Sequence, residues 1–246
     1  MTNLFARNPC HYGVTVSPQP AAPRSRRERP AKPALTRDGI VATAVTVMRA
    51  EGLKRVTMRR LAQELDTGPA SLYVYVRNTA ELHAAILDEL LGAVDLSPAT
   101  DAGDWQDRLV RILTAYTTVL FEHPGLAQSA LVARPSGERY LELIETILAL
   151  LAEGGVPDGR AAWGVDALLQ YATSTAAEQS TRDQAEEAQD DWDALTAALR
   201  DASDTTHPRL AALGDDLLSG SGEDRLGWGL RVLINGMVHT PRPTEA

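Results

Sequence analysis

The sequence predicts an all-α protein in which a small N-terminal unit of three helices, containing a helix-turn-helix, precedes a larger helical domain. Residues that favour helices, such as Ala, Leu, Glu, Arg and Gln, dominate the 246 residues, and only 5% are aromatic. Apolar residues recur at helical spacing over most of the chain after residue 36, and no stretch shows the alternation typical of a strand. With 44% apolar residues, the chain can bury a sizeable core.

Positive charge is concentrated near the N-terminus, although the whole chain carries a net charge of −9. Between residues 24 and 79, twelve Lys and Arg side chains accompany five Asp and Glu, so this segment carries +7 and the rest of the chain −16. Such asymmetry favours a basic nucleic-acid-binding face joined to an acidic body. A basic tail beside an ordinary acidic domain would produce the same balance of charge.

Residues 1–33 are expected to form a disordered basic extension. Five prolines between residues 18 and 33 interrupt any helix, and the segment has no apolar period. Four arginines near its end favour an arm that follows DNA phosphates or enters a minor groove: Arg24, Arg26, Arg27 and Arg29. The alternative is a solvated tail that aids solubility.

Residues 34–80 are predicted to fold as a helix-turn-helix DNA-binding domain. Thr36 is a plausible N-cap for a first helix that Gly52 ends, and Thr57 is a plausible cap for a second helix. A turn at residues 66–68 leads into a short third helix that Pro69 opens. Two helices joined by such a turn are the arrangement with which proteins read the DNA major groove.

Residues 81–240 are predicted to form the larger helical domain. Asn78 and Glu81 resemble a capping box that starts a helix reaching about Val94, and residues 97–103 have the composition of a loop. Residues 181–191 are rich in charge and are expected to be exposed or mobile. The further helices are expected at residues 104–123, 126–133, 138–153, 158–182, 192–200, 208–213 and 223–238.

The residues of the first domain carry a family resemblance. The runs TMRRLAQEL (57–65) and SLYVYVRN (71–78), with the capped helix after them, resemble the DNA-binding head of the TetR family of transcriptional repressors. TAELHAAILDELL (79–91), the start of the helix at residue 104, the pair Arg134–Pro135 and EDRLGWGLRVLINGM (223–237) resemble the tetracycline-repressor subgroup. The sequence departs from the family at Asp66, where the turn usually has Gly, and at Thr79, where a lysine is common.

The resemblance implies a set of DNA-contacting residues in the second and third helices. Arg59 can bond bidentately to a guanine edge, Ala70 and Val74 suit contact with a thymine methyl group, and hydroxyl groups can meet phosphates. For Leu72 and Val76 we expect core packing. The full expected set, with the arm arginines above, is Thr57, Arg59, Pro69, Ala70, Ser71, Tyr73, Val74, Tyr75 and Arg77.

The resemblance also implies that the larger domain dimerises and binds a small molecule. In the last helix Leu226, Leu230, Leu233, Ile234 and Met237 form an apolar stripe, and glycines beside it permit close approach. Paired with the helix at residues 158–182, this stripe suggests a four-helix bundle between two subunits, hence a palindromic operator. The alternative is that both helices pack only within one chain.

By resemblance, eleven residues line the ligand pocket: Asp95, Ile112, Tyr116, Ala130, Leu131, Arg134, Leu143, Thr146, Asp166, Gln170 and Glu178. For Tyr116, Leu131 and Leu143 plain core packing is an equal alternative. Asp95, Ile112 and Ala130 match positions where the tetracycline repressor has the His and Asn residues that contact metal and drug. Because Ala130 cannot ligate a metal, we expect a bulky, partly aromatic natural product or drug without a magnesium requirement.

Other functional classes find little support in the sequence. The five His residues are scattered, and no HExxH, CxxC, GxSxG or phosphate-binding glycine loop is present, so we expect no enzyme, metal or cofactor. The single Cys10 and the lack of a long apolar run predict a cytoplasmic protein without a membrane partner. The expected partners are a double-stranded DNA operator, a second copy of the chain and a small-molecule effector. Alternatives are a helical protein-interaction adaptor, or an activator of the same fold.

Overall fold

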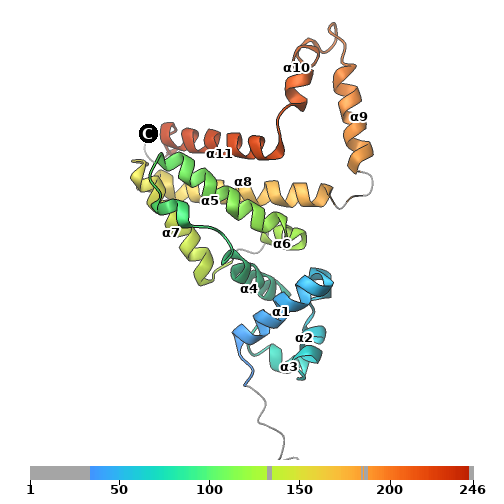
Figure 1. Ribbon diagram of the computed structural model, residues 1–246, viewed down its shortest axis with the longest axis vertical. Coiled ribbons are helices and arrows are strands. Elements are labelled where there is room, and N and C mark those ends of the chain that lie inside the picture. The colour runs from blue at the N-terminus through green and yellow to red at the C-terminus, as the bar shows by residue number, and fades with distance from the viewer. Residues whose placement is uncertain (1–33, 132–134, 184, 186–187, 244–246) are drawn as a thin grey trace, which may run out of the picture. The chain divides into compact units, whose positions relative to one another are not determined.

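The computed structural model describes residues 34–131, 135–183, 185 and 188–243. The arm arginines 24–29 and Arg134 lie outside this part of the chain. The described residues form helices and connecting turns without any strand, which confirms the predicted all-α class (Figure 1). The elements, in order, are α1 (Arg37–Glu51), η2 (Leu53–Arg55), α2 (Met58–Glu64), α3 (Pro69–Leu72), α4 (Thr79–Leu91), η3 (Ser97–Thr100), α5 (Trp105–Phe121), α6 (Pro124–Ala130), α7 (Glu138–Glu153), α8 (Asp158–Arg182), α9 (Ala188–Arg200), α10 (Pro208–Leu218) and α11 (Gly222–His239).

The predicted helix starts are confirmed at four N-caps. The side chains of Thr36, Thr57, Asn78 and Asp104 each accept hydrogen bonds from backbone N–H groups in the first turn of their helix. These bonds satisfy donors that the helix itself leaves unpaired. The predicted bounds of α7 and α8 agree with the structure to the residue.

The capping box predicted at the start of α4 is only half formed. Asn78 Oδ1 accepts from the Glu81 N–H at 2.8 Å, but Glu81 Oε2 accepts from the backbone N–H of Arg77 rather than from that of Asn78. A complete box occurs instead at α11, between Ser221 and Asp224. Removing the Asn78 cap leaves one donor of α4 unpaired.

We therefore expect Asn78→Ala to lower the free energy of unfolding by about 1 kcal/mol, as for other N-cap losses. Urea denaturation followed by circular dichroism measures this change. Asn78→Asp is the matched control, because its carboxylate retains the acceptor. Equal stability of the alanine variant and the parent would show that the cap contributes nothing.

Several predicted boundaries were wrong, each for a local reason. α4 ends at Leu91 rather than Val94, because residues 92–94 continue in tighter i→i−3 turns. Part of the expected loop 97–103 is the 3-10 helix η3. α9 begins at Ala188, inside the charged stretch, where Asp190 and Asp191 suit the positive end of the helix dipole. α10 continues to Leu218.

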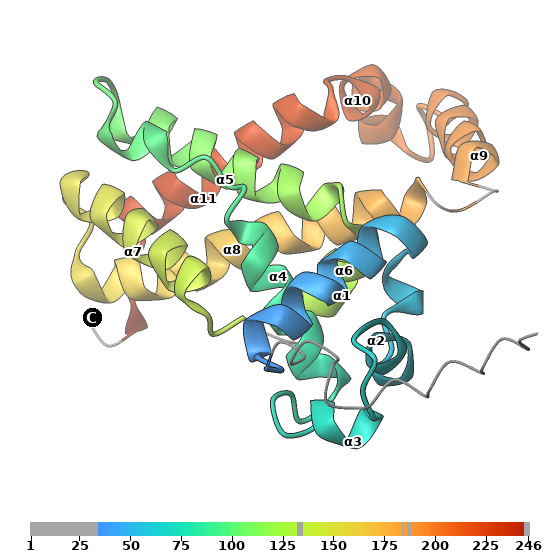
Figure 2. The same ribbon diagram turned by 60° about the horizontal axis from the view of Figure 1, so that its bottom comes forward.

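The larger domain is organised around α8, which contacts α5, α6, α7 and α11 (Figure 2). Its buried side includes Leu168, Ala172 and Ala176, and α5 contributes Leu109, Leu113 and Leu120 to the same core. In the N-terminal part, α1 contacts α2 and α4, and α2 contacts α3. α4 also contacts α5, α6 and α7, so it belongs to both parts of the core.

The apolar stripe of α11 packs within its own chain, so its predicted role as the seam between two subunits was wrong. Leu226, Leu230 and Ile234 are buried against α5 and α8. Close packing of α8 on α11 depends on two glycines, because a Cβ at Gly164 would meet Met237 and a Cβ at Gly229 would meet Tyr171. The outward face of α11 carries different residues, Val232 and Gly236 among them.

Candidate nucleic-acid interface and ligand cavity

The turn between α2 and α3 takes a conformation that glycine usually provides. Asp66 has φ +47°, in the left-handed region that only a few residue types visit. The departure noted in the sequence therefore falls at the one described non-glycine residue with positive φ. Asp66 sustains the tight turn, and α3 begins two residues after Thr67 with Pro69 in its first turn.

Most of the predicted DNA-contacting residues are exposed on α2, α3 and the residues that flank them. Val74 and Tyr73 expose 79% and 52% of their surface, although both are large apolar side chains in a small domain. Leu72 and Val76 are fully buried, as predicted for core positions. Tyr75 is partly buried and packs against the core, so it offers less surface than expected. The remaining exposed members are Thr57, Arg59, Pro69, Ala70, Ser71 and Arg77.

Arg60 holds α2 against the end of α1. Its guanidinium donates to Glu51 Oε1 at 2.6 Å and to Glu64 Oε2 at 2.6 Å. The hydrogen bond from Arg60 lowers the pKa of Glu51 and raises the pKa of Arg60 itself. The neighbouring Arg59 has no ion pair among the described residues and is exposed. Arg60 thus positions α2, and Arg59 remains available to contact a ligand such as DNA.

Arg77 is restrained by Glu81 at the start of α4. Glu81 Oε2 accepts from both the backbone N–H and the Nε of Arg77 at 2.9 Å, and these two hydrogen bonds lower the pKa of Glu81. The Arg77 side chain is nevertheless 85% exposed. A phosphate would have to compete with the Glu81 carboxylate for this guanidinium.

A cavity of about 90 Å³ lies between α5, α6, α7 and α8. Five predicted pocket residues line it: Tyr116, Ala130, Leu131, Asp166 and Gln170. Four lining residues were missed by the sequence reasoning: Pro135, Tyr140, Leu169 and Thr173. Leu169 and Thr173 lie one helical turn or less from Asp166 and Gln170, so the spacing along α8 could have indicated them.

Tyr116 and Thr173 form a buried pair at this cavity. The Tyr116 hydroxyl lies 2.8 Å from Thr173 Oγ1, and burial raises the pKa of Tyr116 to about 12. The phenol therefore stays protonated near neutral pH. It can donate or accept a hydrogen bond without carrying a charge.

The other predicted pocket residues that the structure describes do not line this cavity. Ile112 and Leu143 are fully buried in the core and do not reach the cavity. The Thr146 hydroxyl donates to the Glu142 carbonyl of its own helix, and Glu178 pairs with Arg182 on the surface of α8.

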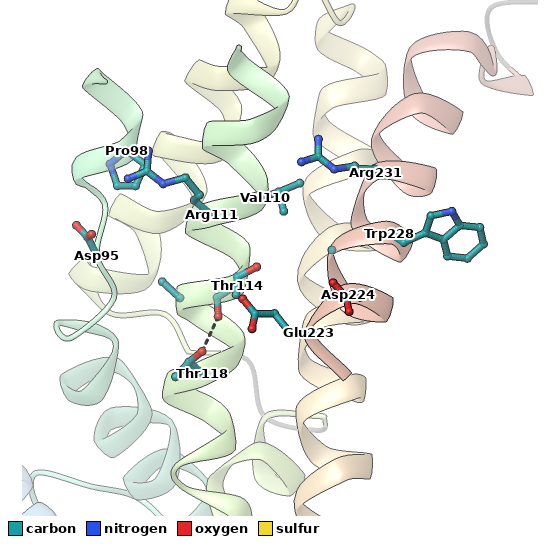
Figure 3. A pocket seen from close by; sticks show the side chains of 12 residues that line it. Asp95, Pro98, Val110, Arg111, Thr114, Thr118, Glu223, Asp224, Trp228 and Arg231 are labelled. Atoms are coloured by element: carbon teal, nitrogen blue, oxygen red, sulfur yellow. Dashed lines mark hydrogen bonds between the residues drawn. The ribbon is translucent and has the colours of Figure 1, made fainter. Parts of the chain in front are cut away.

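Asp95 lies on a separate groove between α5 and α11, of about 720 Å³ (Figure 3). Val110, Thr114 and Ala115 form its side on α5, and Glu223, Gly227 and Arg231 line it from α11. Arg231 also forms an ion pair with Asp107 of α5 at 2.7 Å, which connects α11 with α5. Figure 3 shows the Trp228 indole pointing away from α5.

Helix α6 connects the cavity with the N-terminal part. Ala130 and Leu131 at its end line the cavity. Near its start, a Cβ on Gly125 would lie 3.0 Å from Leu53 Cδ2 of η2, so the two elements touch closely. The Ser129 hydroxyl lies 3.2 Å from Nδ1 of His83 on α4. A displacement of α6 would therefore be transmitted to both η2 and α4.

The α4–α6 contact is expected to make stability fall in mild acid. Burial lowers the pKa of His83 below its usual 6.5, and burial also lowers the pKa of His123. Because the folded state resists protonation, this contribution is complete above pH 6.5 and is lost as the pH falls towards the folded pKa. We expect the thermal midpoint to drop between pH 7.5 and 5.5, and the drop to be smaller in His83→Gln. Parallel pH profiles for parent and variant would contradict the assignment.

The described residues contain no group of three or more His, Cys, Asp and Glu side chains that could hold a metal ion. None of their helices is both long and apolar enough to cross a membrane.

Both parts of the chain match models of known protein families. Residues 40–86 match the family model of bacterial regulatory proteins of the tetR family, and residues 97–240 match that of the tetracyclin repressor-like C-terminal domain. The HTH-type transcriptional repressor DrrR1 of Streptomyces coeruleorubidus is 28% identical over 218 residues, covering 86% of this chain and 80% of that protein.

Two solved structures from Streptomyces are also similar. The transcription regulator SCO7704 from Streptomyces coelicor is 60% identical, with a TM-score of 0.73 over 87% of this chain and 100% of that one. The TetR family protein ActR of Streptomyces coelicolor, in complex with actinorhodin, is 36% identical, with a TM-score of 0.73 over 83% of this chain and 96% of that one.

Proposed function

The chain belongs to the TetR family of transcriptional regulators, and on that premise we propose that it represses transcription by binding a palindromic operator as a dimer until a small-molecule effector releases it. One observation carries the proposal. The exposed face of α2 and α3, with Arg59, Tyr73 and Val74, is linked through α4 and α6 to the cavity that contains the Tyr116–Thr173 pair. Packed helices thus connect the proposed DNA-binding face with the proposed ligand cavity.

We propose the DNA contacts residue by residue. Arg59 bonds to a guanine edge, Ala70 and Val74 meet thymine methyl groups, and the hydroxyls of Thr57, Ser71 and Tyr73 bind phosphates. Thr57 Oγ1 already accepts from the Arg60 N–H, so it acts on phosphate as a donor. Arg77 and the arm arginines supply further phosphate contacts.

For the effector we propose a bulky, partly aromatic natural product or drug that binds without magnesium. The cavity offers two phenols, Tyr116 and Tyr140, together with the amide of Gln170 and apolar walls at Pro135 and Leu169. Ligand pockets usually occupy about 300–1,000 Å³, so a cavity of about 90 Å³ has to widen when such a molecule enters. Ala130 lines the cavity and offers no metal ligand.

Widening of the cavity explains how the effector releases the operator. Moving the end of α6 that carries Ala130 and Leu131 would shift its contacts with Leu53 and His83. In a dimer this shift changes the spacing of the two α3 helices from the roughly 34–36 Å that successive major grooves require. The effector favours the released state only as far as it binds that state more tightly.

We propose that the dimer forms through the outward faces of α8 and α11. Trp163 and Ala167 of α8, and Val232 and Gly236 of α11, are exposed. A Cβ at Gly236 would meet nothing within 4 Å in its own chain, so the backbone there is open to a close partner. The mixture of large apolar and small residues suits a four-helix bundle between two subunits.

The test is binding of the purified full chain to DNA from the region upstream of its own gene. We expect affinity for one palindrome that falls steeply with salt, because phosphate contacts release counterions. Actinorhodin, the molecule bound by ActR, is the first probe for release of that DNA and for a thermal shift. Sequence-independent binding with a shallow salt dependence would refute the repressor. Tight binding of a magnesium–tetracycline chelate would refute the effector class.

The same purified chain and upstream DNA distinguish two alternative functions from repression. An activator of this fold would bind the palindrome but raise transcription from it in a reporter assay. A protein-interaction adaptor would show no salt-dependent palindrome binding. We propose that the chain has no catalytic activity. We also propose that it acts in the cytoplasm, where its operator DNA lies.

A further inference from the structure

α10 and α11 carry a hollow, lined in part by large apolar side chains, that none of the described residues fills. The hollow has a volume of about 450 Å³, and Leu213 and Leu217 of α10 face it together with Trp228 of α11. All three side chains are exposed, and Trp228 exposes 70% of its surface. A large exposed apolar patch of this kind marks a binding surface.

The walls of the hollow are held in place by Arg225. Its Nη2 donates to the carbonyl oxygens of Leu217 and Ser219 at 2.6 Å, and its Nε donates to Ser219 at 2.9 Å. These bonds satisfy carbonyls at the end of α10 and tie that end to the first turns of α11. Leu217 and Trp228 therefore keep a fixed relation, and the hollow does not have to be ordered when it is occupied.

The leucines and the indole give the hollow apolar contact area, Asp216 and Asp224 add two acceptors to its lining, and the hollow lies beside a protruding indole. Figure 3 shows the Trp228 indole pointing outwards, away from α5. Val232 lies one helical turn further along α11 and is also exposed, so Trp228 continues the α8–α11 face. A surface that carries both a protruding side chain and an adjacent hollow can be complementary to itself across a two-fold axis.

We infer that the hollow receives Trp228 from a second copy of this chain. Each indole lies between the partner's indole and its leucines at positions 213 and 217, and the two-fold axis passes between the two indoles. The inference rests on the proposed dimer but adds α10 to its interface and makes Trp228 the anchor. Tryptophans at the centre of interfaces often dominate the binding energy.

Dimer dissociation of the full chain tests the inference, measured by sedimentation at decreasing concentration. We expect Trp228→Ala to raise the dimer dissociation constant about 30-fold or more. The matched control is Trp192→Ala on α9, which removes another exposed indole outside the hollow and should leave dissociation unchanged. Because Trp228 and Trp192 are exposed, both variants should fold with the helix content of the parent, measured by circular dichroism, while only Trp228→Ala loses the stability that dimerisation adds.

Cross-linking gives a second readout. Trp228→Cys also removes the anchor, so the reaction is run at a protein concentration well above the raised dissociation constant. In a Cys10→Ser background, Trp228→Cys should then join to its own copy with a short bifunctional maleimide, and Trp192→Cys should not. A dimeric, operator-binding chain in which Trp228→Ala dissociates like the parent and Trp228→Cys fails to cross-link would overturn this inference alone. A parent chain that stays monomeric and ignores the operator would instead refute the proposed function.

Discussion

Replacing Arg59 with alanine is expected to weaken operator binding roughly 5- to 150-fold, which corresponds to the 1–3 kcal/mol of one lost bidentate base contact. Arg59 is exposed on the first turn of α2 and has no ion pair among the described residues, whereas the adjacent Arg60 is engaged by Glu51 and Glu64. The loss should be confined to the base pair that Arg59 reads. Fluorescence anisotropy with the operator and with single-base variants measures it.

The control for charge is Arg200→Ala, which removes one exposed cation from α9. It should leave base preference and affinity close to those of the parent. If Arg59→Ala weakens binding to the operator and to random DNA equally, Arg59 contacts phosphate and not a base. In that case the slope of affinity with salt should fall by about one unit.

Filling the cavity is expected to produce a repressor that no longer responds. Gln170 lines the cavity from an exposed position on α8, so Gln170→Trp adds bulk there without removing a core side chain. Overpacking typically costs ~1–3 kcal/mol, so we expect the effector concentration for half-release to rise roughly 5- to 150-fold. Operator affinity without effector should be unchanged. Titration of the protein–DNA complex with actinorhodin, or with the effector once found, gives both values.

Gln179→Trp is the matched control, since it places the same indole on α8 away from the cavity. It should release the operator at the concentration that releases the parent. An unchanged response in Gln170→Trp would mean that the effector binds elsewhere. The α5–α11 groove that contains Asp95 would then be the next place to examine.

The fold could be predicted from the sequence because the interactions that start each helix join residues close together in the chain. N-cap side chains such as Thr57 and Asp104 bond to donors two or three residues ahead, so residue type and spacing alone mark the helix starts. Helix ends were harder. The end of α10, for example, depends on Arg225, which lies beyond the helix itself.

The ligand cavity and the dimer interface depend on which helix faces pack against each other. The periodicity of apolar residues does not show which faces do so. The stripe of Leu226, Leu230 and Ile234 shows the same spacing whether it packs against α5 and α8 of its own chain or against a partner. Likewise, Ile112 and Tyr116 lie one turn apart on α5, yet only Tyr116 reaches the cavity. The family resemblance supplied five of the nine cavity residues, which periodicity could not separate from core.

Arg59 and Arg60 divide two duties between neighbouring positions. Arg60 secures α2 to α1 through Glu51, and Arg59, the residue before it, is exposed. Changes at position 59 therefore need not loosen the scaffold, so operator preference can drift during evolution, or be redesigned, while stability is conserved. Position 60 has less freedom, and a library that randomises both positions would mix chains with a loosened α1–α2 contact with retargeted ones.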